Sequence, residues 1–235
     1  MMRALIVDDE LHAREELASL LEETGAFEIV GKCANAVDAI QAIRAQRPDV
    51  LFLDIQMPAI SGFELLSMLD DELEPDVVFV TAHDEHALRA FEERAIDFLL
   101  KPVGRERLAK TLERLRRAPA EFRNLAQFRA PLRRIPCLLN RAIKLVDVSD
   151  IEFARSSEAG VYLSTGTAEL FTELTLKVLE ARAGLVRCHK QYLVRMERID
   201  EVHLEEGGAT LRTLSGKAVP VSRRLLPGLR ERLGI

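Results

Sequence analysis

The sequence predicts an α/β fold, in which a five-stranded, doubly wound parallel sheet is followed by a second, mostly β domain. In the first half of the chain, short apolar runs alternate with amphipathic stretches of helical period. In the second half, the runs are closely spaced and rich in β-branched and aromatic residues. The charge balance also changes sign, because residues 1–130 carry 16 Lys/Arg and 25 Asp/Glu whereas residues 131–235 carry 17 and 13. An acidic half joined to a basic half indicates two domains with different partners.

The first half contains five strand-like runs, each followed by an amphipathic stretch. The expected strands are 4–7, 28–33, 50–54, 77–82 and 97–101. The expected helices are 10–24, 35–47, 62–72, 84–94 and 105–117. A strand and a helix repeated five times predict a parallel sheet with helices on both faces. We therefore expect one domain over 1–117.

A linker is expected over 118–132, where two prolines interrupt any clear period. Beyond it, a domain over 133–235 is expected to contain ten short strands: 135–139, 142–148, 151–157, 160–165, 168–172, 185–189, 192–196, 199–206, 209–214 and 218–222. The stretch EEGGA (205–209) predicts a hairpin turn. Helices are expected at 172–182, with Thr172 as N-cap, and at the C-terminus, with Ser222 as N-cap.

Composition excludes several classes of protein. Nearly half of the 235 residues are hydrophobic, which favours a packed core over disorder. The longest apolar runs are far shorter than the roughly 18 residues that a membrane span needs, and no signal peptide is evident, so no membrane insertion is expected. The three cysteines are scattered and form no CxxC pair, which suits a reducing cytoplasm and disfavours a zinc site.

Acidic residues follow two of the predicted strands. Asp8 and Asp9 come directly after the first strand, and Asp54 ends the third. The carboxyl ends of parallel strands meet at one edge of a sheet, so these acids, together with Thr81 and Lys101, are expected to converge. The acids at 8–10 could simply cap the following helix. Three converging carboxylates are otherwise unstable without a cation, and Mg²⁺ prefers such oxygen ligands.

The strand-end motifs resemble those of response-regulator receiver domains. They are VDDE (7–10), LFLDIQMP (51–58), VTA (80–82) and LLKP (99–102), with Gly62 four residues beyond Pro58. The four motifs occur in order, each at the expected strand end. The resemblance covers residues 1 to about 117.

This resemblance implies a role for each residue of the acidic edge. Asp54 would accept a phosphoryl group, and Asp9 would bind Mg²⁺ directly with help from Asp8 and from the backbone carbonyl of Gln56. The resemblance also implies that Thr81 and Lys101 form the switch pair, which responds to phosphorylation. Phe98 would be the aromatic residue that changes rotamer on activation. The alternatives are a buried strand hydroxyl at Thr81, a solvated surface lysine at Lys101 and an ordinary core residue at Phe98.

The second half resembles LytTR-type DNA-binding domains over about residues 133–235. The most specific piece is Arg-x-His-x-x-Tyr-Leu-Val at 187–194. Two positions depart from the family: Lys190 replaces a frequent Arg, and Arg195 replaces a frequent Asn. The resemblance implies that DNA is contacted by loop residues, which we expect to be Ser157, Glu158, Lys190, Gln191, Arg223 and Arg224.

Together the two resemblances imply a two-component response regulator and not a dedicated enzyme. A sensor histidine kinase would phosphorylate Asp54. Phosphorylation would change the surface of the fourth and fifth helix–strand units and favour a homodimer, which would bind promoter DNA at direct-repeat sites and control transcription.

Two other functions stay open at this point. A haloacid-dehalogenase-type phosphatase also uses a carboxylate and Mg²⁺, but it needs Asp-x-Asp in the first loop, whereas Asp8 and Asp9 are adjacent. The second domain could alternatively bind a protein partner instead of DNA.

Overall fold

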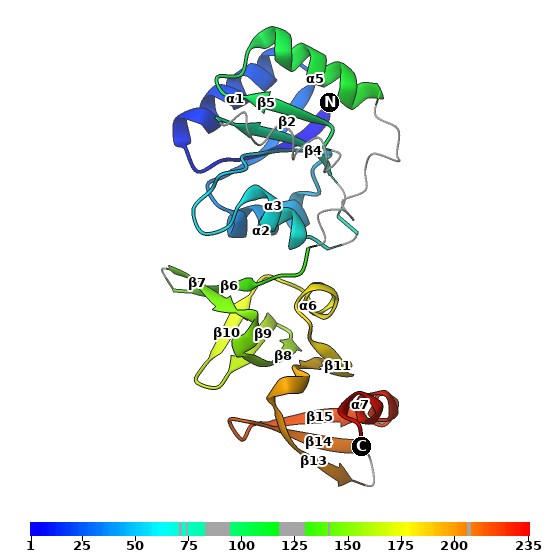
Figure 1. The fold of residues 1–235 in the computed structure, drawn as a ribbon. Helices are drawn as coiled ribbons and strands as arrows, with labels where there is room; N and C mark the ends of the chain where they lie inside the picture. Colours follow the sequence, from blue (N-terminus) through cyan, green and yellow to red (C-terminus); the bar gives the residue numbers. More distant parts are fainter. Residues whose placement is uncertain (71, 74, 83–94, 118–129, 141, 206–207) are drawn as a thin grey trace. The chain divides into compact units, whose positions relative to one another are not determined.

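The structure is a computed structural model that describes all residues except 71, 74, 83–94, 118–129, 141 and 206–207 (Figure 1). The chain forms two compact units, Met1–Ala130 and Pro131–Ile235, which are described separately. Residues 118–129, most of the expected linker, lie outside the described residues, as does the helix expected at 84–94.

The first unit is a three-layer α/β sandwich. Its strands are β1 Met2–Val7, β2 Phe27–Cys33, β3 Val50–Leu53, β4 Asp76–Thr81 and β5 Asp97–Leu100. Its described helices are α1 Leu11–Glu23, α2 Ala36–Gln46, α3 Gly62–Ser67 and α5 Arg105–Arg117. The strands are parallel in the order β2-β1-β3-β4-β5. Helices α1 and α5 cover one face of the sheet, and α2 and α3 cover the other (Figure 1). The predicted doubly wound sheet is confirmed.

The central strands are almost entirely apolar because both faces of the sheet are covered. All four residues of β3 are buried, and so are all six of β4. On the face under α1 and α5, Phe52 and Val78 pack with Leu17 and Leu108 in one apolar cluster. The sheet is therefore a rigid platform, and its strand ends hold side chains in fixed positions.

Helix α3 is shorter than the sequence predicts. It begins at a capping box formed by Ser61 and Glu64, but it ends at Ser67 instead of residue 72. Beyond it, Leu69 and Leu73 are buried and Asp70 pairs with Arg44 of α2. Burial of these apolar side chains and the ion pair favour a turn over continued helix.

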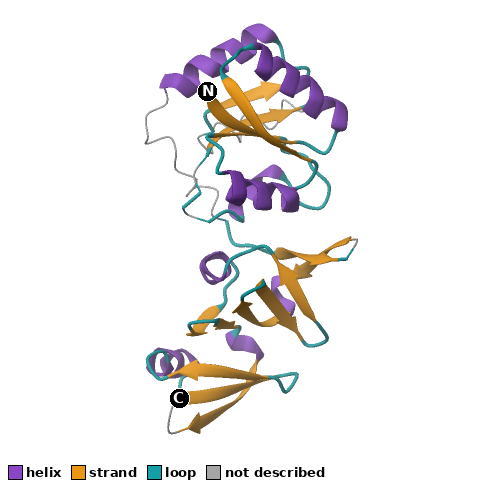
Figure 2. Ribbon diagram, turned by 180° about the vertical axis from the view of Figure 1, so that it is seen from behind, coloured by secondary structure: helices purple, strands orange, loops and turns teal. Residues whose placement is uncertain are grey.

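The second unit is mostly β, as expected (Figure 2). A seven-stranded sheet contains β6 Arg134–Leu139, β7 Ala142–Asp147, β8 Ile151–Ser157, β9 Gly160–Thr165, β10 Glu169–Thr172, β11 Val186–His189 and β12 Tyr192–Val194. A three-stranded sheet contains β13 Ile199–Glu205, β14 Gly208–Thr213 and β15 Ala218–Ser222. The helices are α6 Leu176–Arg182, α7 Leu226–Leu233 and the 3₁₀ turns η3 Val148–Asp150 and η4 Met196–Arg198. The strand orders are β11-β12-β8-β9-β10-β6-β7 and β13-β14-β15.

Both predicted helix caps in this unit are wrong. The hydroxyl of Thr172 donates to the carbonyl of Pro136 at 2.8 Å, which holds Thr172 in β10, and Thr175 caps α6 by accepting from the N–H of Val178. Ser222 belongs to β15, and α7 begins at Leu226 without a side-chain cap. In the described parts of both units, no helix has the length and apolarity that a membrane span requires.

Candidate functional site

The acidic residues predicted to converge do lie together at one edge of the first sheet. The backbone N–H of Asp54 donates to the carbonyl of Val7 at 2.8 Å, which places the ends of β3 and β1 side by side. Carboxylate oxygens of Asp8, Asp9 and Asp54 all lie within 4.8 Å of one another. Asp8 and Asp54 are buried, whereas Asp9 is exposed.

Lys101 neutralises the two buried acids. Its Nζ lies 2.6 Å from Oδ2 of Asp8 and 2.8 Å from Oδ2 of Asp54. Burial raises the pKa of Asp8, although the hydrogen bond from Lys101 opposes that shift. Burial alone would lower the pKa of Lys101, but its hydrogen bonds to Asp54 and Asp8 raise it instead, so the ammonium is strongly favoured. The alternative of a solvated surface lysine is therefore wrong.

Backbone groups orient both carboxylates. Oδ1 of Asp8 accepts from the N–H of Glu10 at 2.9 Å, and Oδ1 of Asp54 accepts from the N–H of Gln56 at 3.1 Å. Helix α1 has no side-chain cap, so the capping alternative for the opening acids is not supported. Gly62 lies so close that a Cβ there would be 2.4 Å from the backbone oxygen of Asp54, which explains the requirement for glycine.

Thr81 ends β4 beside Lys101. Its side chain is fully buried, and its Oγ1 has no hydrogen-bond partner among the described residues. The N–H of Lys101 donates to the carbonyl of Thr81 at 2.8 Å, so the two residues are held next to each other. A buried hydroxyl without a partner is energetically unfavourable, and a ligand oxygen at this edge would satisfy it.

The donor set of this edge fits a hard divalent cation. Its three carboxylates, together with nearby backbone carbonyls, offer the oxygen ligands that Mg²⁺ prefers. Asp9, the exposed member, leaves room for the bound waters that Mg²⁺ usually keeps.

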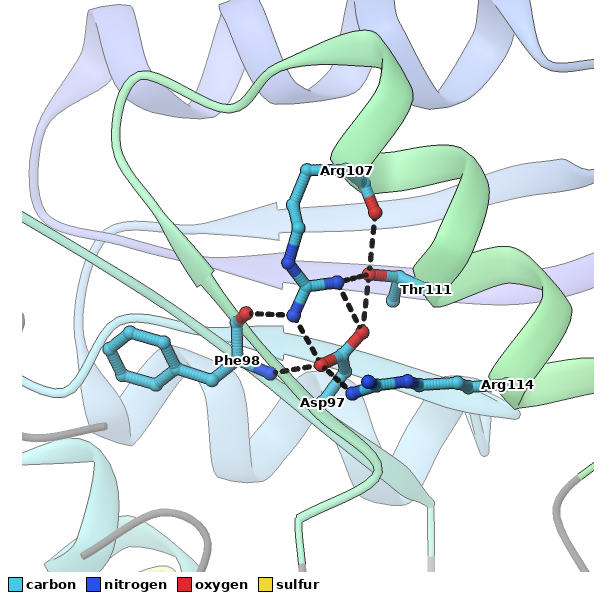
Figure 3. A network of polar contacts seen from close by, with 5 residues as sticks. All are labelled: Asp97, Phe98, Arg107, Thr111 and Arg114. Carbon is cyan, nitrogen blue, oxygen red and sulfur yellow. Dashed lines mark hydrogen bonds and ion pairs between the residues drawn. The ribbon is translucent and has the colours of Figure 1, made fainter. Parts of the chain in front are cut away.

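Phe98 lies beside an ion-pair network that the sequence analysis missed (Figure 3). Asp97 has a fully buried side chain, and it receives hydrogen bonds from Arg107, Thr111, Arg114 and its neighbour's backbone N–H. Burial would raise the pKa of Asp97, but the hydrogen bonds, first of all from Arg107, lower it. Arg107 also donates to the carbonyl of Phe98 at 2.6 Å.

The ring of Phe98 points away from this network and is half-buried (Figure 3). The signal for the network was present in the sequence, because Arg107 and Arg114 are seven residues apart on one face of α5. Their partner, Asp97, is an acid that begins an otherwise apolar strand.

The residues predicted to contact DNA are all exposed, and except for Ser157, the last residue of β8, they lie in turns: Ser157, Glu158, Lys190, Gln191, Arg223 and Arg224. The N–H of Ser156 donates to the carbonyl of Gln191 at 2.9 Å, so the end of β8 and the β11–β12 turn lie side by side. Arg223 and Arg224 directly follow β15, a strand of the smaller sheet that packs next to β11.

Several residues near this surface are structural. Arg187 pairs with Glu180 at 2.6 Å. Tyr192 packs its ring against Phe153 and His189. Arg195, which departs from the family pattern, is mostly buried and donates to the carbonyl of Ala183 at the end of α6. Its role is therefore to hold α6 against β12.

Comparisons with known proteins agree with both halves. A model of the response regulator receiver domain matches residues 4–113, and a model of the LytTr DNA-binding domain matches residues 141–234. The sequence is 51% identical over 237 residues to an uncharacterized response regulatory protein of Vibrio cholerae, covering 100% of this chain and 99% of that protein. It is 49% identical over 239 residues to the transcriptional regulatory protein BtsR of Escherichia coli K12, covering 100% of both.

Among solved structures, the response regulatory domain of protein mrkE from Klebsiella pneumoniae is 36% identical, with a TM-score of 0.45 over 50% of this chain and 97% of that chain. The fold and the acidic edge define the chain as a two-component response regulator. It belongs to the response regulators that join a receiver domain to a LytTR DNA-binding domain, which are regulatory and not enzyme families.

Proposed function

We propose that Asp54 accepts a phosphoryl group from a sensor histidine kinase, and that this modification strengthens sequence-specific binding of the second unit to promoter DNA. The observation that carries the proposal is the arrangement at the sheet edge. A buried carboxylate, Asp54, is paired with Lys101 beside Thr81, whose hydroxyl has no hydrogen-bond partner in the described part of the chain. A phosphoryl group on Asp54 would supply the acceptor oxygens that both Lys101 and Thr81 can bind.

Each residue of the acidic edge would have a distinct role. A carboxylate oxygen of Asp54 attacks the phosphorus of the kinase's phosphohistidine, so that an O–P bond forms while the N–P bond breaks and the histidine leaves. Asp9, Asp54 and the carbonyl of Gln56 would hold Mg²⁺, with Asp8 assisting, and the bound ion would neutralise charge that builds up on the transferring group. Lys101 binds oxygens of the phosphorylated product, and the hydroxyl of Thr81 donates to one of them.

Coupling to the rest of the receiver would run through β4 and β5. If Thr81 and Lys101 move toward the phosphoryl group, β5 is displaced at Phe98 and at the Asp97 network. We propose that the altered surface favours a receiver homodimer. The exposed face of α5 supports this, because it presents a basic stripe of Lys110, Arg114 and Arg117. The sequence 84–94, outside the described residues, carries four acids and two arginines, so its net charge is negative and complements this stripe.

A dimer would place two DNA-binding units on direct-repeat sites. The second half carries only a small positive excess, so one copy should bind DNA weakly, and two linked copies gain affinity through effective concentration. Phosphorylation would increase the population of the dimer that binds DNA tightly, and it would not create binding from nothing. The unphosphorylated protein should therefore still bind DNA, but less tightly.

Labelling with a radioactive acyl phosphate tests the phosphorylation step. The full chain should incorporate label in the presence of Mg²⁺, and incorporation should be lost with EDTA or in Asp54→Asn. Asp38→Asn, which removes an exposed acid of the same unit, should be labelled normally. Label on Asp54→Asn, or label that resists EDTA, would exclude Asp54 and Mg²⁺ from these roles.

A gel-shift titration tests the coupling step. The probe is a DNA duplex selected by the protein from a random-sequence library. The affinity of the chain for this duplex should increase when an acyl phosphate and Mg²⁺ are added, and the increase should be absent in Asp54→Asn. Equal affinity with and without phosphorylation would contradict the proposed switch.

A further inference from the structure

Glu152 is an acid buried inside the second unit, only 2% exposed, at a β-bulge in β8. Ile151 pairs with Thr165 and Phe153 pairs with Ser164, so Glu152 is the extra residue on its strand. A bulge redirects the side chain of the extra residue and is a specific feature of a sheet. Here it directs a carboxylate toward the smaller, three-stranded sheet.

The carboxylate of Glu152 binds the turn between β14 and β15. It accepts hydrogen bonds from the hydroxyl of Thr213 at 3.0 Å, the backbone N–H of Ser215 at 3.0 Å and the hydroxyl of Ser215 at 2.5 Å. The donors are two hydroxyls and a peptide group. These contacts between the two sheets therefore depend on direction and distance, as hydrogen bonds do.

A second residue of the same turn, Lys217, binds β9, the strand opposite the bulge. The ammonium of Lys217 donates to Oγ of Ser164 at 2.9 Å and to the carbonyl of Thr165 at 2.6 Å. Ser164 and Thr165 are the β9 residues that face the bulge. We call these two sets of contacts the clasp: those of Glu152 with Thr213 and Ser215, and those of Lys217 with Ser164 and Thr165.

The two sheets also share an apolar cluster, and Arg198, which precedes β13, donates to the carbonyl of Ser149, which precedes β8. Phe153 and Val194 of the larger sheet pack with Leu211 and Val219 of the smaller one in a single cluster. Apolar burial is not directional, so this cluster holds the sheets together without fixing how one is turned on the other. Hydrogen bonds in a buried, low-dielectric place do fix it. The clasp supplies the orientation that the apolar cluster lacks.

The orientation matters because the proposed DNA contacts are divided between the sheets. The end of β8 and the β11–β12 turn, with Ser157 and Lys190, belong to the larger sheet. Arg223 follows β15 of the smaller sheet, which begins directly after the clasped turn. We infer that Glu152 is a positioning residue for DNA recognition, which fixes the spacing between the base-reading residues of the two sheets. This inference rests on the proposed DNA-binding function.

The double variant Thr213→Val, Ser215→Ala tests the inference. It removes both hydroxyls that bind Glu152 and leaves the backbone contact with Ser215; Thr213→Val also removes the acceptor of the Lys217 backbone N–H. The matched control is Thr210→Val, on the same strand β14, whose hydroxyl binds Glu205 within the smaller sheet and does not cross to the larger one. Thermal unfolding checks that each variant is folded at the assay temperature.

Binding is measured by fluorescence anisotropy on two DNA duplexes, one selected from a random-sequence library by the unmodified chain and one scrambled. The double variant should lose at least tenfold affinity for the selected duplex and stay within twofold on the scrambled one, because non-specific binding needs charge and not exact spacing. The control should match the unmodified chain on both.

Three results separate the possible failures. Unchanged affinity of the double variant for the selected duplex would overturn the inference. Equal losses on both duplexes would also overturn it, because they would indicate general destabilisation. If the unmodified chain selects no preferred sequence from the library, then sequence-specific DNA binding itself fails, and the inference fails with it.

Discussion

The ammonium of Lys101 lies between two buried carboxylates from different strands, 2.6 Å from Asp8 and 2.8 Å from Asp54. It stands where the first and third strands end, the place at which Mg²⁺ would have to neutralise the same acids. Lys101 and the cation would therefore both neutralise the carboxylates of Asp8 and Asp54. Without the metal, the ammonium and the backbone N–H groups of Glu10 and Gln56 stabilise the two carboxylates at this edge.

Replacing Lys101 by Met should make stability depend on magnesium. With the buried carboxylates of Asp8 and Asp54 left unpaired, the free energy of unfolding in EDTA should fall by about 3 kcal/mol. Added Mg²⁺ should restore most of this loss, whereas the unmodified chain should respond less. Urea denaturation with EDTA and with Mg²⁺ measures both. A variant as stable as the unmodified chain in EDTA would show that the ammonium does not neutralise these acids.

Thr81→Val should separate signalling from stability. The hydroxyl of Thr81 has no hydrogen-bond partner among the described residues, so its removal should change the free energy of unfolding by less than about 1 kcal/mol. Phosphorylation should still occur, but the phosphorylation-dependent gain in DNA affinity should be lost. Thr81→Ser, which keeps the hydroxyl, should retain the gain. A large loss of stability in Thr81→Val would indicate that the hydroxyl already has a structural partner.

Asp97→Asn should destabilise the receiver in a pH-dependent way. The hydrogen bonds from Arg107 and other donors outweigh burial and lower the pKa of Asp97, so the fold favours its ionised form. The stabilisation is complete above the unfolded pKa near 3.9 and is lost as the pH falls through the lower folded value. At pH 7 the variant should be less stable by about 2 kcal/mol, and the difference should shrink below about pH 4.

Denaturation curves between pH 3 and pH 7 measure the effect of Asp97→Asn. Glu113→Gln is the control, because Glu113 is an exposed acid on the same helix as Arg107 and Arg114. It should match the unmodified chain at every pH. A gap between Asp97→Asn and the unmodified chain that stays constant down to pH 3 would contradict the stabilising role of the charge.

The three cysteines should be unreactive in the folded protein. Burial raises the pKa of Cys33 to about 11 and that of Cys137 and Cys188 to about 12. The thiolate is the reactive form, so alkylation at pH 7.5 should be negligible in native conditions. After denaturation, mass spectrometry should find all three thiols modified. Rapid modification of a native thiol would show that its surroundings open readily.

The sheet of the receiver could be predicted from the sequence because its strands are short apolar runs separated by helices of clear period. The positions of Asp8, Asp54 and Lys101 followed from the rule that parallel strands end at one edge. The early end of α3 could not be predicted, since Leu69 and Leu73 continue the apolar pattern but are buried outside the helix. The end of α3 is therefore set by tertiary burial of these side chains and not by the apolar periodicity of the sequence.

The contacts of the second unit were harder to predict. Thr172 and Thr175 are equally good helix caps by type, and the choice depends on the carbonyl of Pro136, 36 residues earlier in the chain. The partners of Glu152 lie more than 60 residues away, so no local pattern reveals them. Glu152 was not singled out from the sequence, although it is an acid between two apolar residues of a predicted strand.

The arginines that follow β15 should have separable roles in DNA binding. If Arg223 reads a guanine edge, Arg223→Ala should reduce affinity for the library-selected duplex by about 1–3 kcal/mol and change affinity for a scrambled duplex much less. If Arg224 contacts phosphate, Arg224→Ala should weaken both duplexes alike and lower the slope of log affinity against log salt by about 0.9. Arg230→Ala, an exposed position on α7, is the control. Full binding by the double variant of Arg223 and Arg224 would instead favour a protein partner for this unit.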